Sequence, residues 1–177
     1  DEYRIAGARI ENLLVGIRGK GGIFNINPIT MNLYGGTASG EKTIDVRGIA
    51  PKADVRFSLR DLQSGPLLTD VLRKDFFEGV ARADLKLSAD GDTAEQIKKS
   101  LRGRGEVKFN DGAVKGIDLA AMARNVKAAF GMETRGGPRP RTDFAELAVP
   151  FTITDGLVTI PLASMKAPFI RLEASGK

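Results

Sequence analysis

The 177-residue chain contains no cysteine and no histidine. Without cysteine it cannot form a disulfide framework, so cysteine usage does not identify its compartment. The two absences also exclude a cysteine or histidine nucleophile, a histidine general base and nearly all zinc sites. Catalysis would therefore have to rest on serine with lysine, or on paired carboxylates.

The acidic residues form no recognisable catalytic or metal-binding pattern. Glu78 with Asp84 is a candidate carboxylate pair, but nothing in the sequence brings the two together. Asp90, Asp92 and Asp111 lack the spacing and the terminal glutamate of a calcium-binding EF-hand, and roles in turns or helix caps account for all three. We therefore expect a protein that is not an enzyme and that holds no metal and no cofactor.

The segment Gly35–Thr43, GGTASGEKT, nearly matches a phosphate-binding loop. Glu41 intrudes between Gly40 and Lys42, and a carboxylate at that point would repel a phosphate group. No helical pattern follows, although a phosphate-binding loop leads into a helix. The segment therefore predicts a hairpin loop.

Long hydrophobic runs are also missing. No run approaches the ~18 apolar residues that a membrane-spanning helix needs, and no signal peptide is visible. The 27 basic and 22 acidic residues give a net charge of +5, and both signs are scattered along the chain, which favours an ordinary charged surface. The phenylalanines and tyrosines alternate within strand patterns instead of interleaving with basic residues, so we expect no nucleic-acid partner.

The two ends of the chain suggest that it is part of something larger. It begins at Asp1 without an initiator methionine and ends inside an alternating segment, 169–177. We interpret residues 1–177 as a single β-rich domain cut from a longer protein. A segment outside this chain would then attach that protein to a membrane.

Alternation of apolar and polar residues runs through most of the chain and predicts strands. Glycine, proline, asparagine and aspartate separate these segments, as is typical of turns. Pro28 cannot donate a ladder hydrogen bond, so we expect it at a sheet edge or a bulge. Asp155-Gly156 predicts a type I′ hairpin turn, in which asparagine should replace Gly156 better than valine, and Asn110-Asp111-Gly112 predicts another turn.

Three helices are expected beside these strands. One opens near Ser64, with Pro66 in its first turn, where the missing N–H costs nothing. A second begins at Thr93, which can form a capping box with Gln96. The third extends over residues 118–130, with one apolar face. That face carries Leu119, Met122, Ala123, Val126 and Phe130.

These elements predict a β-rich α+β fold: a long, curved, mostly antiparallel sheet of eight or more strands with about three packed helices. The apolar strand faces exceed what three short helices can cover. Three alternatives follow from this surplus. An apolar face stays open as a concave groove, the sheet closes on itself, or strands cover one another as a sandwich and enclose a dry core.

Three segments resemble the AsmA family, in the order in which that family carries them. Residues 27–40, NPITMNLYGGTASG, are similar to its "P-x-x-x-x-L-Y-G-G" segment. Residues 103–119, GRGEVKFNDGAVKGIDL, resemble its signature of a strand, a turn and "GIDL" ahead of an alanine-rich helix. Residues 142–158, TDFAELAVPFTITDGLV, resemble its "T-x-F-x-x-L-x-x-x-F-x-I-x-x-G" stretch.

The resemblance implies a cellular setting. Proteins of this family are envelope proteins of double-membraned bacteria, anchored in the inner membrane with a large periplasmic part. They are linked to outer-membrane biogenesis and are thought to offer an apolar β-groove along which lipid chains move. The chain would then be a non-enzymatic periplasmic segment that binds phospholipid or another envelope lipid. The alternatives are a scaffold that assists outer-membrane protein assembly without binding lipid, and a basic module for an anionic polymer.

None of the family segments names a binding residue, so the candidates come from alternation and charge. The candidates for an apolar groove, which a dry core would explain equally well, are Val107, Phe109, Leu147, Val149, Phe151 and Ile153. The best basic patch is the loop 135–141, RGGPRPR, which is either a solvated loop or a contact for lipid headgroups. The headgroup candidates within it are Arg135, Arg139 and Arg141.

Overall fold

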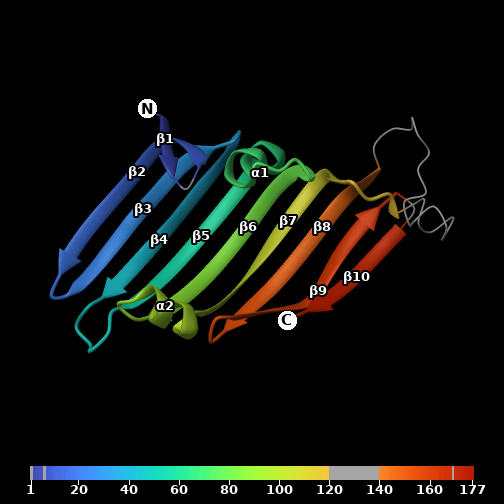
Figure 1. Ribbon diagram of the computed structural model, residues 1–177. Coiled ribbons are helices and arrows are strands. Elements are labelled where there is room, and N and C mark those ends of the chain that lie inside the picture. The colour runs from blue at the N-terminus through green and yellow to red at the C-terminus, as the bar shows by residue number, and fades with distance from the viewer. Residues whose placement is uncertain (1, 6, 120–139, 169) are drawn as a thin grey trace.

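The computed structural model describes residues 2–5, 7–119, 140–168 and 170–177, and its strands form one open sheet (Figure 1). Each strand pairs antiparallel with the strand that precedes it and the strand that follows it in the chain, so the prediction of a long antiparallel sheet is confirmed. The strands are β1 Glu2–Ile5, β2 Ala8–Lys20, β3 Ile23–Leu33, β4 Gly36–Asp45, β5 Lys52–Gln63, β6 Phe77–Asp90, β7 Arg102–Lys115, β8 Arg141–Thr154, β9 Leu157–Ala167 and β10 Ile170–Gly176.

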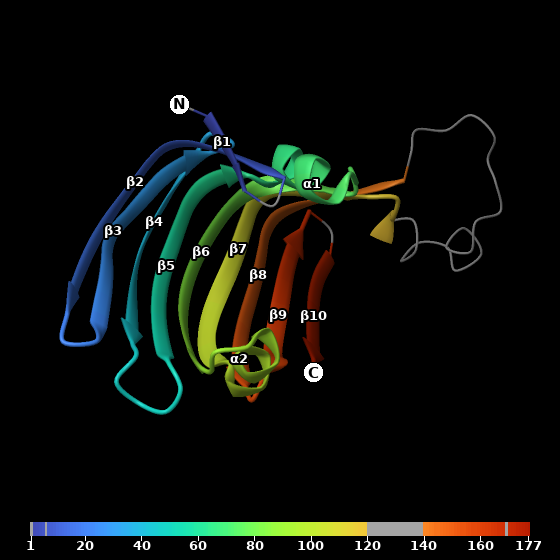
Figure 2. The ribbon, with the colours of Figure 1, turned by 60° about the vertical axis from the view of Figure 1, so that its left-hand side comes forward.

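The central strands are unusually long. β6, β7 and β8 have 14 residues each, so each extends about 45 Å, more than twice the usual length. Figure 2 shows that the strands bend along their length, so that the sheet is a curved band. The expected curvature is therefore present.

Bulges contribute to this bend. Asn12, Asp61 and Asp111 all have left-handed backbones, with φ of 52°, 55° and 49°. Each lies on or beside a shift in strand register, where one strand carries an extra residue. Such bulges bend the strand and increase its twist. The pairing of β2 through β7 places the three in line across the sheet, near the end where β5 passes into the first helix.

The turn predicted at Asn110-Asp111-Gly112 is therefore wrong. β7 continues through these residues to Lys115, and Asp111 forms a bulge inside it. The turn predicted at Asp155-Gly156 is confirmed, because both residues have positive φ, 51° and 76°, between β8 and β9. A type I′ turn requires positive φ at both central residues.

Two further predictions concern β3 and β4. Pro28 does lie at a bulge, because the register of β3 with β4 shifts between Ile26 and Ile29. The hairpin loop predicted over Gly35–Thr43 is shorter than expected: the turn is formed by Tyr34 and Gly35, and β4 begins at Gly36. Small and β-compatible residues after the turn allow the strand to start at once.

The described part of the chain contains two helices, α1 Ser64–Leu72 and α2 Ala94–Ser100, so the prediction of three is not matched. The helix expected over 118–130 falls mainly on residues 120–130, which lie outside the described residues. α1 has Pro66 in its first turn, as predicted. In α2 the Thr93 side chain accepts a hydrogen bond of 3.2 Å from the Gln96 N–H, which confirms the predicted cap.

The fully buried apolar residues are few, and most are small. Leu62, at 2% exposed, is the largest fully buried side chain among the described residues. An aromatic cluster adds to it: the Phe77 ring lies 4.8 Å from the ring of Phe109 and 5.5 Å from that of Phe144. The fold therefore has no thick interior between two layers, and its stability comes from strand pairing and from clusters beside the helices.

Candidate binding face of the sheet

The register divides the sheet into two chemically different sides. Directly opposed residues on neighbouring strands point to the same side of a sheet. One such row crosses β2 to β8: Val15, Ile29, Gly40, Phe57, Leu85, Gly105 and Phe151. The rows beside it are Met31, Ala38, Leu59, Ala83, Val107 and Val149 on one flank, and Ile17, Ile26, Lys42, Val55, Leu87, Gly103, Ile153 and Val158 on the other. We call this side the apolar face.

The opposite side, which we call the charged face, carries the alternate residues of the same strands. Two of its rows are Glu41, Arg56, Lys86, Arg104 and Thr152, and Ser39, Ser58, Asp84, Glu106 and Pro150. Ion pairs hold many of its charges, such as Arg56 with Glu41 at 2.8 Å and Arg60 with Asp84 at 2.7 Å. The hydrogen bonds from Arg60 and from Ser58 hold the pKa of Asp84 below its ordinary value. This face is therefore suited to water.

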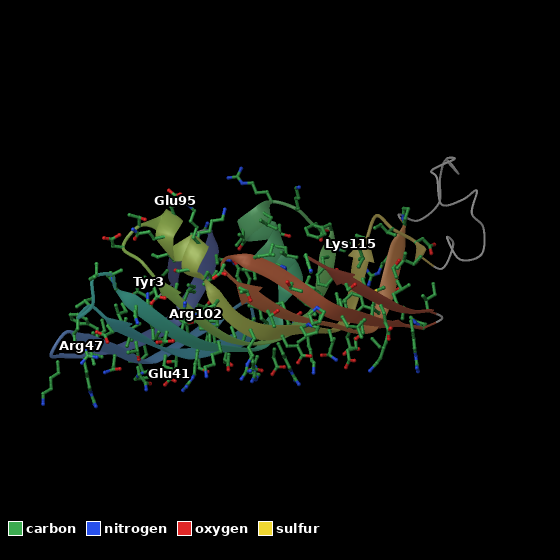
Figure 3. All side chains as sticks on the ribbon, turned by 90° about the horizontal axis from the view of Figure 1, so that it is seen from below. Tyr3, Glu41, Arg47, Glu95, Arg102 and Lys115 are labelled. Carbon is green, nitrogen blue, oxygen red and sulfur yellow. The ribbon has the colours of Figure 1, made fainter. Side chains whose placement is uncertain are left out.

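Both helices lie on the apolar side. Figure 3 shows α1 and α2 on one side of the sheet and Glu41, a member of the charged face, on the other. In Figure 2 the two helices lie at opposite ends of the strands, on the concave side of the band. α1 contacts β6 and β2, and α2 contacts β6. In the described part of the chain, no other element covers the apolar face.

Much of the apolar face is consequently only half-buried. Its middle carries half-buried residues on four neighbouring strands: Val55, Phe57, Leu59, Leu85, Leu87, Val107, Phe109, Leu147, Val149 and Phe151. At the β2 side the exposure increases, to 43% for Val15 and 67% for Ile17. A sheet with one solvated side normally turns its polar side outward. Here the apolar side is also left accessible between the two helices.

α1 is fixed at one end of this face by a polar cluster. The Asp70 carboxylate accepts a hydrogen bond of 2.8 Å from the Tyr34 hydroxyl and one of 2.8 Å from the Arg9 Nε. The Tyr34 hydroxyl also accepts a bond of 3.0 Å from the Arg9 backbone N–H. The Tyr34 hydrogen bond and the Arg9 guanidinium hold the pKa of Asp70 below its ordinary value, although partial burial opposes them. The cluster joins α1 to β2 and to the end of β3.

The beginning of α1 is joined to β6 in a similar way. Ser64 is buried, and its hydroxyl donates a hydrogen bond of 2.8 Å to the Gly79 carbonyl. Val71 and Leu72, at the end of α1, are 40% and 51% exposed. They are exposed because α1 is short and lies at the end of the sheet, where no second layer meets it.

α2 is fixed at the other end. The Ser100 hydroxyl accepts a bond of 2.9 Å from the Asp90 N–H and also donates to the Asp90 carbonyl. The Gly156 N–H in the β8–β9 turn donates to the Leu101 carbonyl at 2.8 Å. Both ends of the apolar face therefore have a helix with specific polar attachments, and no other described element covers the stretch between them.

The six groove candidates predicted from the sequence lie together on this face. Val107 is opposite Val149, and Phe109 is opposite Leu147. Phe151 and Ile153 are opposite Gly105 and Gly103, which leave room for larger neighbours. Five of the six are half-buried, and Ile153 is the most buried at 9% exposed. Their role in lipid binding stays a prediction.

The headgroup candidates are a different case. Arg135 and Arg139 lie outside the described residues. Arg141 begins β8 and forms ion pairs of 2.8 Å with Glu78 and 2.7 Å with Asp143. Two carboxylates already neutralise its guanidinium, so a lipid phosphate would have to displace one of them.

Sequence reasoning missed most of the apolar face. It named residues on β7 and β8 only, whereas the register adds Phe57, Leu85 and the exposed residues of β2. Their alternation was visible in the sequence, but alternation alone does not say which strands are neighbours. It also missed Lys42, which lies among apolar residues on this face.

The described residues in the three rows of the apolar face are apolar apart from Lys42. Among the described residues, no three acidic side chains gather in a way that could hold a metal ion. No helix in the described part of the chain is long and apolar enough to cross a membrane. The described strands form a wide apolar surface on one side of the sheet and a charged surface on the other.

Comparison with known proteins identifies a family. The model of the AsmA family matches residues 2–163, which is most of the chain. No curated protein and no solved structure matches it.

Proposed function

The chain belongs to the AsmA family, and we propose that it is a non-enzymatic, periplasmic segment of an envelope protein that binds lipid acyl chains on its apolar face. Proteins of this family are associated with the cell envelope. The finer assignment rests on the observation that the apolar face is continuous across β2 to β8 and that, among the described elements, only α1 and α2 contact it. Contiguous exposed apolar surface of this extent is typical of binding sites.

The shape of the face favours an extended ligand. Its central row crosses seven strands, and neighbouring strands lie about 4.8 Å apart, so that row extends roughly 29 Å. The side chains along a row are aliphatic, aromatic or glycine, with Lys42 as the one charged exception in the three rows. An acyl chain lying along such a row would bury its methylenes against apolar atoms only.

The expected energetics follow from burial. Each methylene removed from water contributes roughly 0.8 kcal/mol. Binding should therefore strengthen with chain length and change little with salt. Binding through the basic segment 135–141 would show the opposite behaviour and weaken steeply as salt increases.

A titration with fluorescent acyl lipids tests the proposal. Two probes with the same zwitterionic headgroup and different chain lengths are titrated into the whole chain at low and high salt. We expect tighter binding of the longer probe and similar affinities at the two salt concentrations. An organic extract of the purified chain, analysed by mass spectrometry, should in addition contain lipid.

The alternative is an assembly scaffold that uses the same face to contact other envelope proteins. No binding of either probe, together with a lipid-free extract, would overturn the lipid proposal and favour this scaffold. Binding that depends on salt and not on chain length would instead point to the basic loop.

A further inference from the structure

Lys42 lies at an unusual position in the sheet. Its directly opposed neighbours are Ile26 on β3 and Val55 on β5, and its neighbours along the same side of β4 are Gly40 and Ile44. In the three rows that define the apolar face, it is the only charged side chain. It is half-buried, and it forms no ion pair with any other described residue.

An ordinary explanation for a lysine in a strand does not apply here. Lysines at the edges of sheets prevent association with other strands. β4 is an interior strand, because β3 and β5 both pair with it. An ammonium group among apolar side chains costs free energy unless its end reaches water or an anion. The position is therefore tolerated only where the ammonium reaches water or an anion.

The surroundings of Lys42 fit an anionic group better than a protein carboxylate. Several cations of the charged face pair with carboxylates, such as Arg56 with Glu41 and Arg82 with Asp61. The register supplies no carboxylate beside Lys42 on the apolar face. The lysine stem is long enough to lie against apolar neighbours while its ammonium stands above the sheet. There the ammonium would contact the polar group at the end of a ligand that lies on the apolar face.

We propose that Lys42 binds the anionic headgroup of an acyl lipid whose chain lies on the apolar face. This inference rests on the proposed function and adds to it a class of ligand, the anionic lipids, and an orientation. The headgroup lies at β4, on the side of the face toward Ile44 and the end of the strand. The acyl chain extends from there along the rows toward β8.

The test uses two fluorescent phospholipids with identical acyl chains, one with the anionic phosphatidylglycerol headgroup and one with the zwitterionic phosphatidylcholine headgroup. Both are titrated into the whole chain and into three variants, Lys42→Met, Lys42→Arg and Lys86→Met. Lys86 is a matched control, because it is a lysine on an interior strand, β6, of the charged face. The methionine variants remove the charge and keep an unbranched side chain of similar length.

We expect the parent chain to prefer the anionic probe on the order of tenfold, which corresponds to the net value of one charge-assisted contact. Lys42→Met should abolish this preference, while Lys42→Arg should retain it. Lys86→Met should behave like the parent. Higher salt should reduce the preference in the parent but not the affinity for phosphatidylcholine.

Three results would overturn the inference. The parent binds both probes equally, Lys42→Met keeps the preference, or Lys86→Met loses it to the same extent. In each of these cases phosphatidylcholine still binds, and the proposed function stands. If neither probe binds the parent at all, the proposed function fails and the inference fails with it.

Discussion

The backbone N–H of Gly156 donates a hydrogen bond of 2.8 Å to the carbonyl oxygen of Leu101. This bond joins the β8–β9 turn to Leu101, the residue that follows α2 as its C-cap. The two segments are more than 50 positions apart in the sequence, so their contact fixes α2 over the far end of the sheet. The approach is close because Gly156 has no side chain: an added Cβ would collide with the carbonyl oxygen of Lys98.

The first prediction concerns this contact. Gly156→Val and Gly156→Asn should both destabilise the chain, by about 1–3 kcal/mol. Asparagine tolerates the positive φ of 76° better than valine does, but its Cβ meets the same Lys98 carbonyl. The difference in stability between the two variants should thus be smaller than the stability that both lose relative to the parent. Thermal melting measures both.

A second glycine turn provides the control for this prediction. Gly21, between β2 and β3, also has positive φ, 57°, but an added Cβ would meet nothing within 4 Å. Gly21→Asn should therefore melt close to the parent. Equal destabilisation by Gly21→Asn and Gly156→Asn would show that backbone strain, and not the contact with α2, decides the effect.

The second prediction concerns pH and the attachment of α1. The hydrogen bonds from Tyr34 and Arg9 lower the pKa of Asp70 below its ordinary value of 3.8. A carboxyl whose pKa is lower in the folded chain stabilises the fold above the unfolded pKa, and this contribution disappears as pH falls through the folded pKa. The parent should therefore melt higher than Asp70→Asn by a constant margin above about pH 5. That margin should shrink as the solution becomes more acidic.

Tyr34→Phe checks the cause of this pH dependence. It removes the hydroxyl that contributes most to the lowered pKa and leaves Arg9 in place. Tyr34→Phe should melt at a higher temperature than the double variant that also carries Asp70→Asn, but by a smaller margin than the one between the parent and Asp70→Asn. As the pH falls, this smaller margin should disappear at a higher pH. If both margins have the same pH dependence, Tyr34 is not the group that sets the pKa of Asp70.

The third prediction compares two neighbouring phenylalanines. Phe77 contacts the rings of Phe109 and Phe144, whereas Phe76 is 45% exposed. Phe77→Ala should cost about 3 kcal/mol of unfolding free energy, because it leaves a cavity between two aromatic rings. Phe76→Ala should cost less than about 1 kcal/mol. Denaturant unfolding of both variants measures the difference, and similar losses would mean that the cluster does not contribute as a unit.

Two Asx–Gly sequences show what local chemistry can and cannot predict. Asp111-Gly112 and Asp155-Gly156 read alike, and both aspartates do adopt left-handed backbones, with φ of 49° and 51°. Only the second reverses the chain. The residues after Asp111 continue to pair with β6 and β8, so the left-handed residue becomes a bulge in a continuous strand. Long-range pairing decides between the two outcomes, and a short sequence window does not contain it.

The sequence also predicts the candidate face only in part: it indicates the side of a strand on which a residue lies, but not which strands are neighbours. Alternation correctly assigns Val107 and Phe109 to one side of β7, and Val149 and Phe151 to one side of β8. It does not reveal that Val15, on β2, belongs to the same row as Phe151 across seven strands. Register is set by turns and bulges together, and the bulges at Asn12 and Asp61 were not recognisable before the pairing was known.

The last prediction tests which side of the sheet binds lipid, by changing neighbouring residues that face opposite ways. Leu14 and Val15 are both exposed, at 58% and 43%. Leu14 is opposite Thr30 on the charged face, and Val15 is opposite Ile29 on the apolar face. Because both are already accessible to water, a glutamate at either position should leave the fold intact.

The two variants match in net charge, in position on β2 and in the class of side chain removed. Val15→Glu places a carboxylate in an apolar row, and an acyl chain lying there would have to strip water from it. Affinity for a zwitterionic acyl probe should fall on the order of tenfold. Leu14→Glu should bind like the parent.

A second matched pair examines the other end of the face. Leu157 and Val158 on β9 are 57% and 44% exposed, and Val158 is opposite Ile153 on the apolar face, whereas Leu157 is opposite Thr154. Val158→Glu, and not Leu157→Glu, should weaken binding wherever the acyl chain reaches β9. A ligand confined to the β2 side would respond to the first pair only, and one confined to the β9 side to the second only. If Leu14→Glu and Leu157→Glu weaken binding as much as Val15→Glu and Val158→Glu do, the acyl chains do not lie on the apolar face. The loss of affinity would then come from the added charge, whichever side of the sheet carries it.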